Sequence, residues 1–405
     1  MKLSSRVREL NESVTLKLNA KATSLAEEGR EIYNLTAGQL PFRPMPEFTN
    51  LLRSELDFLK SYQYAPVPGF ADLRKKIIGY LEQTRDIKIP ADFDCVIGNG
   101  AKHAIANVLG CLLELGDEVV LLAPYWVSYP EMVKFCRGKP VIVSSSSFEQ
   151  FEPSIEDIEA AITKNTRVII INSPNNPAGI HYSEKWMRAF ASMIKKYPDV
   201  AIISDEIYYE LSYFDPKPTF FYQYEPELLN RTVIVDGISK TLASTGLRIG
   251  WCVCPKELAA AVSKLQGQTT SGANSLVQRA LAGFDLSLIE TFLDPIKRHL
   301  RDNSETLREA LRAQKLSHSW YQSTSAFYFL IDFSQCPAIS KFKKSDSDTT
   351  DYSFELCEAL LESHGVAMVP GQAFGMPNTA RLSLVMEKDP FKIACEKITN
   401  FMNGD

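Results

Sequence analysis

The sequence of 405 residues contains no run of about 18 apolar residues, so we expect no membrane-spanning helix. It also lacks a marked excess of either charge. The formal net charge of -5 favours neither a nucleic-acid partner nor an anionic lipid surface. The first residues show no apolar segment followed by a small-residue cleavage site, so we expect no secretory signal peptide. These features together predict a cytoplasmic protein.

The eight cysteines include no Cys-x-x-Cys pair. Cys252 and Cys254 lie closest together, in an apolar stretch that is typical of a strand. Side chains two residues apart on a strand share a face and could bind a metal, but no histidine lies nearby. Buried free cysteine is the commoner arrangement, so we expect no metal site and no disulfide framework.

Short apolar runs alternate with helical patterns between about residues 70 and 290. The runs occupy residues 95–97, 118–122, 140–143, 167–171, 200–203, 232–235 and 249–253. This alternation predicts an α/β fold with a mainly parallel seven-stranded sheet covered by helices on both faces. The length favours two domains. We expect a large domain of residues 46–290 and a smaller α+β domain built from residues 1–45 plus 291–405.

The expected smaller domain contains fewer strands. We expect a helix over most of the first 29 residues, a short strand at 31–36 and a long helix from about 285 to 314. A strand pair at 325–332 and 380–385 follows. The segment 341–351, rich in Ser, Lys and Asp, is expected to be a mobile loop.

Polar residues follow four of the predicted strands of the large sheet. These segments are Gly98–Lys102, Asn172–Gly179, Ser204–Tyr208 and Asp236–Lys240. Ligands of open α/β sheets bind beyond the carboxyl ends of the strands. Each segment alone is weak support for a site, but together they predict a ligand at one edge of the sheet.

The glycine turn at Gly98–Gly100 opens a helix that we expect to run from His103 to Leu115. Free backbone N–H groups and the positive end of the helix dipole make such a turn a phosphate site. A dinucleotide fingerprint is the first alternative, but His103 stands where its third glycine belongs, and no acidic residue follows the next strand. An ordinary tight turn without a ligand is the second.

Lys240 and Asp205 follow two of these strands. Most lysines are solvated surface charges, but a lysine among the polar ends of a sheet can lose solvent and become nucleophilic. Asp205 could be an ordinary helix cap, or the carboxylate that keeps a pyridinium cofactor an electron sink. Trp126 could be a core residue or could stack on a flat cofactor.

Arg381 opens a predicted apolar strand near the C-terminus. A buried arginine needs an anion, and its planar fork suits a substrate carboxylate. A structural salt bridge is an equally good interpretation from the sequence.

These residues together resemble the class I aminotransferases of fold type I, which depend on pyridoxal phosphate (PLP), and in particular the bacterial aspartate aminotransferase branch. The most specific match is Ser239-Lys240-Thr-Leu-Ala-Ser-Thr-Gly246-Leu-Arg248-Ile-Gly250-Trp, which is similar to the pattern S-K-x(5)-T-G-x-R-x-G-[YW]. Asn172-Ser-Pro-Asn-Asn-Pro-Ala-Gly and Ser204-Asp-Glu-Ile-Tyr also match family motifs, as do Thr36-Ala-Gly, Tyr64-Ala-Pro-Val-Pro-Gly, Pro124-Tyr-Trp, Val369-Pro-Gly-Gln-Ala-Phe-Gly and Arg381-Leu-Ser. The resemblance covers nearly the whole chain.

The resemblance implies a role for each matching residue around PLP. Lys240 would carry the cofactor as a Schiff base and move a proton, and Asp205 would pair with the pyridine nitrogen. Asn176 and Tyr208 would bind the ring oxygen, and Trp126 would stack on the ring. The residues implied around the phosphate are Gly100, Ala101, Lys102, Ser239, Arg248 and, from a partner subunit of a homodimer, Tyr64.

The resemblance also implies the substrate contacts. Arg381 would bind the α-carboxylate beside the backbone of Gly38, with Trp126 and Asn176 nearby. Lys102, assisted by hydroxyl residues such as Thr15, would bind a side-chain carboxylate, although the cofactor phosphate is an alternative partner for Lys102.

The sequence departs from the family pattern in several places. Gly237 stands where some relatives have a phosphate-binding serine, so Ser239 or Ser244 could substitute for it. The loop after Gly38 reads Gln39-Leu-Pro instead of the usual G-E-P-D pattern, so the substrate-entry loop departs from the family. Three further departures are Ala178, Leu247 and Ser325.

We therefore expect an aminotransferase that exchanges an amino group between an amino acid, with L-aspartate leading, and a 2-oxo acid, with 2-oxoglutarate leading, in a ping-pong reaction. The alternatives are an aromatic, kynurenine-like or prephenate-like aminotransferase, or a related PLP lyase. A third class, the PLP-binding sensor domain of a transcription regulator, is discarded because the pattern begins near residue 13 and no basic patch is present.

Overall fold

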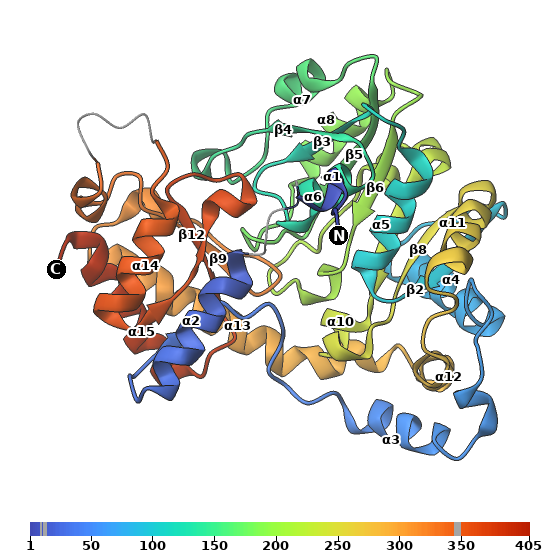
Figure 1. The fold of residues 1–405 in the computed structure, drawn as a ribbon, viewed down its shortest axis with the longest axis horizontal. Helices are drawn as coiled ribbons and strands as arrows, with labels where there is room; N and C mark the ends of the chain where they lie inside the picture. Colours follow the sequence, from blue (N-terminus) through green and yellow to red (C-terminus); the bar gives the residue numbers. More distant parts are fainter. Residues whose placement is uncertain (9, 11–13, 344–349) are drawn as a thin grey trace.

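The computed structural model describes the backbone of residues 1–8, 10, 14–343 and 350–405, and their side chains except those of residues 14–16. Seven strands form one sheet in the order β2-β8-β7-β6-β5-β3-β4 (Figure 1). Their bounds are β2 Phe93–Gly98, β3 Glu118–Leu122, β4 Lys139–Val143, β5 Thr166–Asn172, β6 Ala201–Asp205, β7 Thr232–Gly237 and β8 Gly250–Pro255. Only β8 runs against the other six strands. The predicted mainly parallel seven-stranded sheet is confirmed.

Helices cover both faces of this sheet because its strands are apolar on both sides. Val119 and Val168 belong to one apolar cluster, whereas their neighbours Val120 and Ile169 belong to another. This alternation follows from the two-residue period of a strand. The helices of this part are α3 Pro46–Glu55, α4 Ala71–Arg85, α5 Ala101–Leu112, α6 Ser128–Phe135, α7 Ile155–Ala161, α8 Glu184–Ile194, α9 Phe221–Tyr224, α10 Ile238–Thr241, α11 Lys256–Thr269 and α12 Ser275–Gly283.

A three-stranded antiparallel sheet, β11-β12-β9, forms a second apolar layer on the left of Figure 1. The predicted strand pair is present in it, although β9 begins at Tyr328 rather than residue 325. The strands outside the large sheet are β1 Tyr33–Asn34, β9 Tyr328–Asp332, β10 Val366–Ala367, β11 Val369–Pro370 and β12 Thr379–Ser383. The other helices are α1 Ser5–Arg8, α2 Val14–Glu27, α13 Leu288–Ala313, α14 Ser353–His364 and α15 Lys388–Asn403.

The N-terminal segment packs on the C-terminal one, as the colours of Figure 1 show. Strand β1 pairs in parallel with β10, and the Lys21 Nζ atom on α2 lies 2.6 Å from a carboxylate oxygen of Glu358 on α14. The predicted boundary between two domains, at residues 46 and 290, stays a prediction. Part of the predicted mobile loop, residues 344–349, lies outside the described residues.

One helix and one strand differ in their bounds from the sequence prediction. Helix α5 begins at Ala101, directly after the glycine turn, and ends at Leu112, whereas the pattern predicted 103–115. Strand β1 is limited to two residues because only Tyr33 and Asn34 meet a partner strand.

Among the described residues, no helix is both long and apolar enough to cross a membrane.

Candidate active site

The polar residues predicted to meet at the sheet edge come together there. Strands β2, β5, β6 and β7 are parallel to one another, so their carboxyl ends lie on one side. Lys240 lies in the short helix α10 that follows β7, and its Nζ donates a hydrogen bond of 2.6 Å to the carbonyl oxygen of Gly38. The N-terminal segment therefore contacts this edge of the sheet through the backbone of Gly38.

Lys240 is partly accessible to solvent although it lies deep among protein atoms. The pKa of its amino group is lowered to about 7, first by burial and then by the nearby cations Arg381 and Arg248, whereas the charge of Asp205 opposes them. At neutral pH a large share of this amine is therefore unprotonated. An unprotonated amine can act as a nucleophile or a base.

Asp205 ends strand β6 and is buried. Its Oδ2 accepts a hydrogen bond of 2.5 Å from the hydroxyl of Tyr129, and its Oδ1 accepts one of 3.3 Å from the backbone N–H of Ile207. Burial raises the pKa of this carboxyl to about 6, although the Tyr129 hydrogen bond lowers it. Within the described part of the chain, no cation forms an ion pair with Asp205. The carboxylate thus has room for a cationic partner from a ligand.

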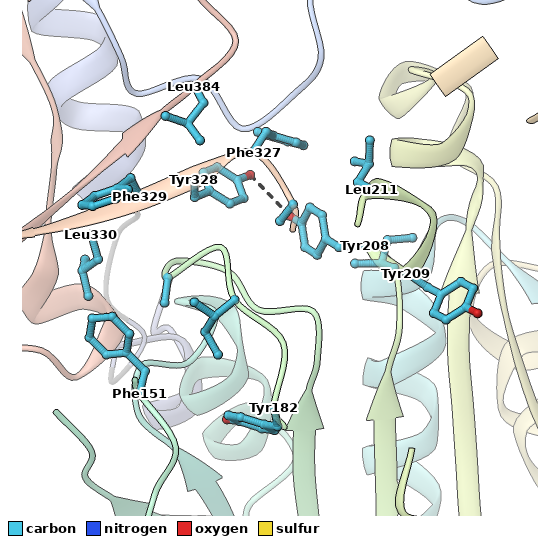
Figure 2. Close-up of a cluster of buried hydrophobic side chains, with 14 of the residues drawn as sticks. Phe151, Tyr182, Tyr208, Tyr209, Leu211, Phe327, Tyr328, Phe329, Leu330 and Leu384 are labelled. Carbon is cyan, nitrogen blue, oxygen red and sulfur yellow. Dashed lines mark hydrogen bonds between the residues drawn. The ribbon is translucent and has the colours of Figure 1, made fainter. Parts of the chain in front are cut away.

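Asn176, Tyr208 and Arg381 form a chain of polar contacts. The Arg381 Nη1 donates to the Asn176 Oδ1 at 3.0 Å, and the Asn176 Nδ2 lies 3.4 Å from the Tyr208 hydroxyl. Tyr208 in turn faces Tyr328 across 3.3 Å between hydroxyl oxygens, as the dashed line in Figure 2 shows. Figure 2 also shows Phe327 beside this pair. These contacts join the edge of the large sheet to β12 and to the first residue of β9.

Arg381 is buried without a carboxylate partner among the described residues. Its second terminal nitrogen donates to the Thr36 carbonyl oxygen at 3.0 Å, and its Nε has no hydrogen-bond partner. The guanidinium lies over the rings of Tyr328 and Phe374 at 4.4 and 5.1 Å. The predicted salt-bridge alternative is therefore wrong within the described chain. A buried guanidinium with a free donor is suited to an anion from a ligand.

The glycine turn places backbone N–H donors at the start of α5. Gly100 has a φ of 90°, and no side chain caps the helix. The N–H groups of Ala101 and Lys102 are in the first turn, where a helix offers no internal acceptor. A Cβ atom on Gly100 would lie 2.6 Å from a terminal nitrogen of Arg248. The guanidinium thus packs directly against the turn.

Arg248 donates to the carbonyl oxygens of Thr245 and Asn99 at 2.7 and 3.1 Å and forms no ion pair in the described chain. The two serines that could replace Gly237 differ. The Ser244 hydroxyl donates to the Leu242 carbonyl at 2.7 Å, whereas the Ser239 hydroxyl makes no hydrogen bond to a described residue. This difference leaves Ser239 the more available of the two.

Lys102 and Trp126 lie side by side. The Lys102 Nζ is 4.9 Å from the centre of a Trp126 ring, and the half-buried Trp126 meets the ring of Tyr129 edge to face. Lys102 forms no ion pair or hydrogen bond with a described residue. Burial lowers the pKa of its amino group, and so does the charge of Arg248.

The loop after Gly38, which departs from the family pattern, contacts the segment after Lys240. Its Gln39 side chain accepts a 3.0 Å hydrogen bond from the Thr245 hydroxyl.

Two predicted site residues are not brought to this site by the described side chains. Tyr64 is 93 % exposed and makes no hydrogen bond or ring contact within the described chain. The backbone of Thr15 lies in α2, but its side chain lies outside the described part.

Sequence reasoning missed Tyr129, Tyr328 and Asn172. Tyr129 lies three residues after Trp126, so its place in the same segment was a usable signal. Asn172 ends β5, and its amide donates to the Asp205 carbonyl oxygen at 3.0 Å. Nothing in the sequence near Tyr328 indicates that its hydroxyl meets Tyr208, because that contact depends on the packing of two distant segments.

Comparison with known proteins agrees with this geometry. Residues 30–398 match the family model for class I and II aminotransferases. The chain is 33 % identical over 407 residues to the aspartate aminotransferase of Bacillus subtilis, with 99 % of each chain covered. It is also 33 % identical over 409 residues to the aspartate/prephenate aminotransferase of Nitrosomonas europaea, with full coverage of both.

The structure resembles solved aminotransferases over its whole length. It superposes on the aspartate aminotransferase of Thermus thermophilus with maleate with a TM-score of 0.88 and 30 % identity, covering 99 % of this chain and 100 % of the other. The predicted fold type is thus confirmed. From its sequence, its fold and its active-site residues, the chain belongs to the class I and II aminotransferase family and is an aminotransferase.

Proposed function

We propose that this enzyme uses the site around Lys240 to transfer the amino group of L-aspartate to 2-oxoglutarate with PLP as its cofactor. The observation that carries the proposal is a set of three charges that form no ion pair with a described residue: the buried carboxylate of Asp205, the buried guanidinium of Arg381 and the exposed guanidinium of Arg248. Family membership implies PLP as the cofactor.

The residues present fit PLP. A phosphate suits the uncapped start of α5, where Arg248 packs against Gly100 and a larger residue would fill the space. A protonated pyridine nitrogen suits the buried carboxylate of Asp205. When bound there, PLP supplies an electron sink for the electron pair of the substrate Cα–H bond. Trp126 offers a flat face, and Asn176 and Tyr208 offer hydrogen bonds to a ring oxygen.

Lys240 would hold the cofactor and would move the proton at the substrate Cα through its Nζ. Its lowered pKa supports this role because proton transfer is most efficient when the pKa of the group lies near the working pH. Tyr208 and Asn176 would keep the ring in register while the substrate changes.

Arg381 would bind the α-carboxylate of the substrate. The free Nε and the fork geometry support this role, and Asn176 and the Thr36 carbonyl fix the plane of the guanidinium. The carbonyl oxygen of Gly38, two residues after Thr36, accepts the hydrogen bond from Lys240.

The preference for a dicarboxylic substrate rests on Lys102. Its ammonium group forms no ion pair with a described residue, and it lies beside Trp126 in the first turn of α5. A cation in the first turn opposes the helix dipole unless an anion compensates it. The relatives named aspartate aminotransferase, and the Thermus thermophilus structure with the dicarboxylate maleate, support this choice.

We also propose a cytoplasmic homodimer in which Tyr64 of one copy completes the phosphate site of the other. The exposure of Tyr64 supports this arrangement, and all eight cysteines are free, as is usual in a reducing compartment.

The test is a panel of amino acids added to the PLP-loaded protein, with loss of the cofactor's visible absorbance as the measurement. We expect aspartate and glutamate to bleach the cofactor and 2-oxoglutarate to restore it, and we expect Lys240→Ala to abolish turnover. Faster bleaching by phenylalanine or kynurenine would assign the enzyme to aromatic substrates. Transfer by Lys240→Ala near the wild-type rate would contradict the role of Lys240, and release of ammonia would indicate a lyase.

A further inference from the structure

A buried arginine, Arg85, contacts residues next to the active site but has no role in the proposed reaction described above. Arg85 is the last residue of α4 and is 1 % exposed. Its Nε lies 3.0 Å from a carboxylate oxygen of Glu206, and a terminal nitrogen lies 2.9 Å from one of Asp236. Glu210 is a third, weaker partner at 3.8 Å. One cation therefore faces three carboxylates.

Each partner in this cluster is fixed by further contacts. The Glu206 Oε1 accepts hydrogen bonds of 2.7 and 2.8 Å from the hydroxyls of Tyr222 and Ser204. The guanidinium carbon of Arg85 lies 3.7 Å from the centre of the Tyr209 ring. The Arg85 cluster, as we call Arg85 with Glu206, Asp236 and Glu210, is thus a fully packed ionic centre.

The cluster joins β6, which ends at Asp205, to β7, which the short helix with Lys240 follows. Glu206 directly follows Asp205 at the end of β6, and Asp236 lies on β7 four residues before Lys240. The strands pair in parallel, with Asp205 opposite Val235. Figure 2 shows Tyr208 directed to Tyr328 and the ring of Tyr209 extending away from that pair. Consecutive tyrosines therefore serve the active site and the Arg85 cluster.

Stability alone is a poor reason for such a cluster. Removing ions from water costs several kcal/mol for each ion, and apolar replacements of buried ion pairs are often neutral or stabilising. Charges in a low-dielectric interior act over longer distances than charges at the surface. Glu206 is the residue after Asp205, and its charge raises the pKa of the Asp205 carboxyl. Asp236 lies on β7, four residues before Lys240, so we expect the charges of the cluster to act on Lys240 as well.

We propose that Arg85 is a positioning residue for the aminotransferase reaction, which locks the ends of β6 and β7 together and, with Glu206 and Asp236, sets the electrostatic potential at Lys240. The inference rests on the proposed function, because it assumes that Lys240 and Asp205 act on PLP.

The sign of the effect follows from the charges. Around Lys240 the other charged groups are Asp205, Arg248 and Arg381. Each carboxylate of the Arg85 cluster, in its ionised form, should stabilise the protonated form of the nitrogen at Lys240, and the positive charge of Arg85 should oppose this effect. Arg85 also favours the ionised form of Asp236 and Glu206, whose pKa values burial raises. Removing one carboxylate should therefore lower the pH at which that nitrogen loses its proton, and removing Arg85 as well should raise it again.

The experiment is a pH titration of the visible absorbance of bound PLP in the full-length holoenzyme. Asp236→Asn should move the midpoint of this titration down by about half a pH unit or more. The double variant Arg85→Gln/Asp236→Asn keeps the net charge of the wild-type cluster and should bring the midpoint back toward the wild-type value. Glu206→Gln removes the other carboxylate and should also lower the midpoint, which provides a second arm if the double variant does not fold.

A cluster that only stabilises the fold would lower the melting temperature of these variants and leave the midpoint in place, and that result would overturn the proposal. A shift in Asp236→Asn that the double variant does not reverse would also overturn it. Wild-type protein that binds no PLP would instead contradict the proposed function, so the two failures are distinguishable.

Discussion

At the residue scale, the active site is a set of ionisable groups whose charged forms are destabilised by removal from water. Lys240, Asp205 and Arg381 are surrounded by protein, and their pKa values are displaced in the direction that burial dictates for each. Such displaced groups in one place are typical of functional sites. This destabilisation should be measurable in the free energy of unfolding of the PLP-free protein.

Lys240 should make the stability of the PLP-free protein depend on pH. Its folded pKa is lowered to about 7 from 10.5, so between these values the unfolded chain binds a proton that the folded chain has released. The free energy of unfolding should therefore rise with pH over this window, by at most about 1.4 kcal/mol for each pH unit. Urea unfolding at several pH values should show this rise in the wild type and a flatter curve in Lys240→Met.

The matched control for that experiment is Lys264→Met, since Lys264 is an exposed lysine of α11. Its curve should follow the wild type. Identical curves for Lys240→Met and the wild type would contradict the lowered pKa of Lys240.

Lys102 should decide between classes of substrate. Lys102→Ala removes the cation beside Trp126, so kcat/KM for aspartate and glutamate should fall about tenfold or more, the equivalent of about 1.4 kcal/mol, while aromatic amino acids are spared. Steady-state kinetics with both classes provides the measurement and its internal control. Equal losses for both classes would assign Lys102 to the cofactor phosphate.

At the scale of elements, the site depends on close contact between backbones. Strand β8 runs against its neighbours, so its first residue, Gly250, lies at the same edge as the start of α5. A Cβ atom on Gly250 would lie 2.2 Å from the backbone nitrogen of Ala101 and 2.6 Å from the carbonyl carbon of Gly100. Neither is the end of a flexible side chain. The proposed phosphate turn can therefore approach β8 only because this residue has no side chain.

Gly250→Ala should displace the start of α5 and weaken PLP binding by about tenfold or more, with a loss of stability of about 1–3 kcal/mol from overpacking. Fluorescence titration with PLP and urea unfolding would measure the two effects. Gly79→Ala, in the middle of the exposed side of α4 with no atom within 4 Å of the added Cβ, should instead stabilise the protein slightly. Unchanged PLP affinity in Gly250→Ala would show that α5 does not hold the phosphate.

At the scale of the whole molecule, one exposed apolar segment stands out. It comprises Leu56, Phe58, Leu59, Tyr62 and Tyr64, which are between 51 and 93 % exposed. Apolar side chains gathered in this way are typical of a surface that a partner covers. In the proposed homodimer, this segment faces the second copy.

Tyr64→Phe should weaken retention of PLP by about 1–3 kcal/mol, because one hydrogen bond to a charged phosphate is lost across the proposed interface. Equilibrium dialysis would measure the affinity, and sedimentation would measure the oligomeric state. Tyr62→Phe is the control, because the Tyr62 hydroxyl donates to the Leu56 carbonyl within its own loop. A fully active monomer in solution would contradict the shared site.

The sequence by itself determined the large sheet and the gathering of polar residues at its edge. Apolar β-branched runs of strand length can bury both faces only in a covered, mainly parallel sheet, and parallel strands place their carboxyl ends together. Lys240, Asp205, Asn176 and Gly100 were therefore predictable, because each lies in a polar segment at the carboxyl end of a predicted strand. The resemblance to a family placed Arg381 and Tyr208 with them.

Only the tertiary structure decided the contacts between distant segments. The Tyr129 hydroxyl on Asp205, the Tyr328 hydroxyl on Tyr208 and the Arg85 side chain between Glu206 and Asp236 join residues that lie 76, 120 and up to 151 positions apart. No local pattern encodes such pairs. Whether a buried arginine meets a carboxylate or remains open to a ligand depends on which side chains the packed core brings to it, and this separates Arg85 from Arg381.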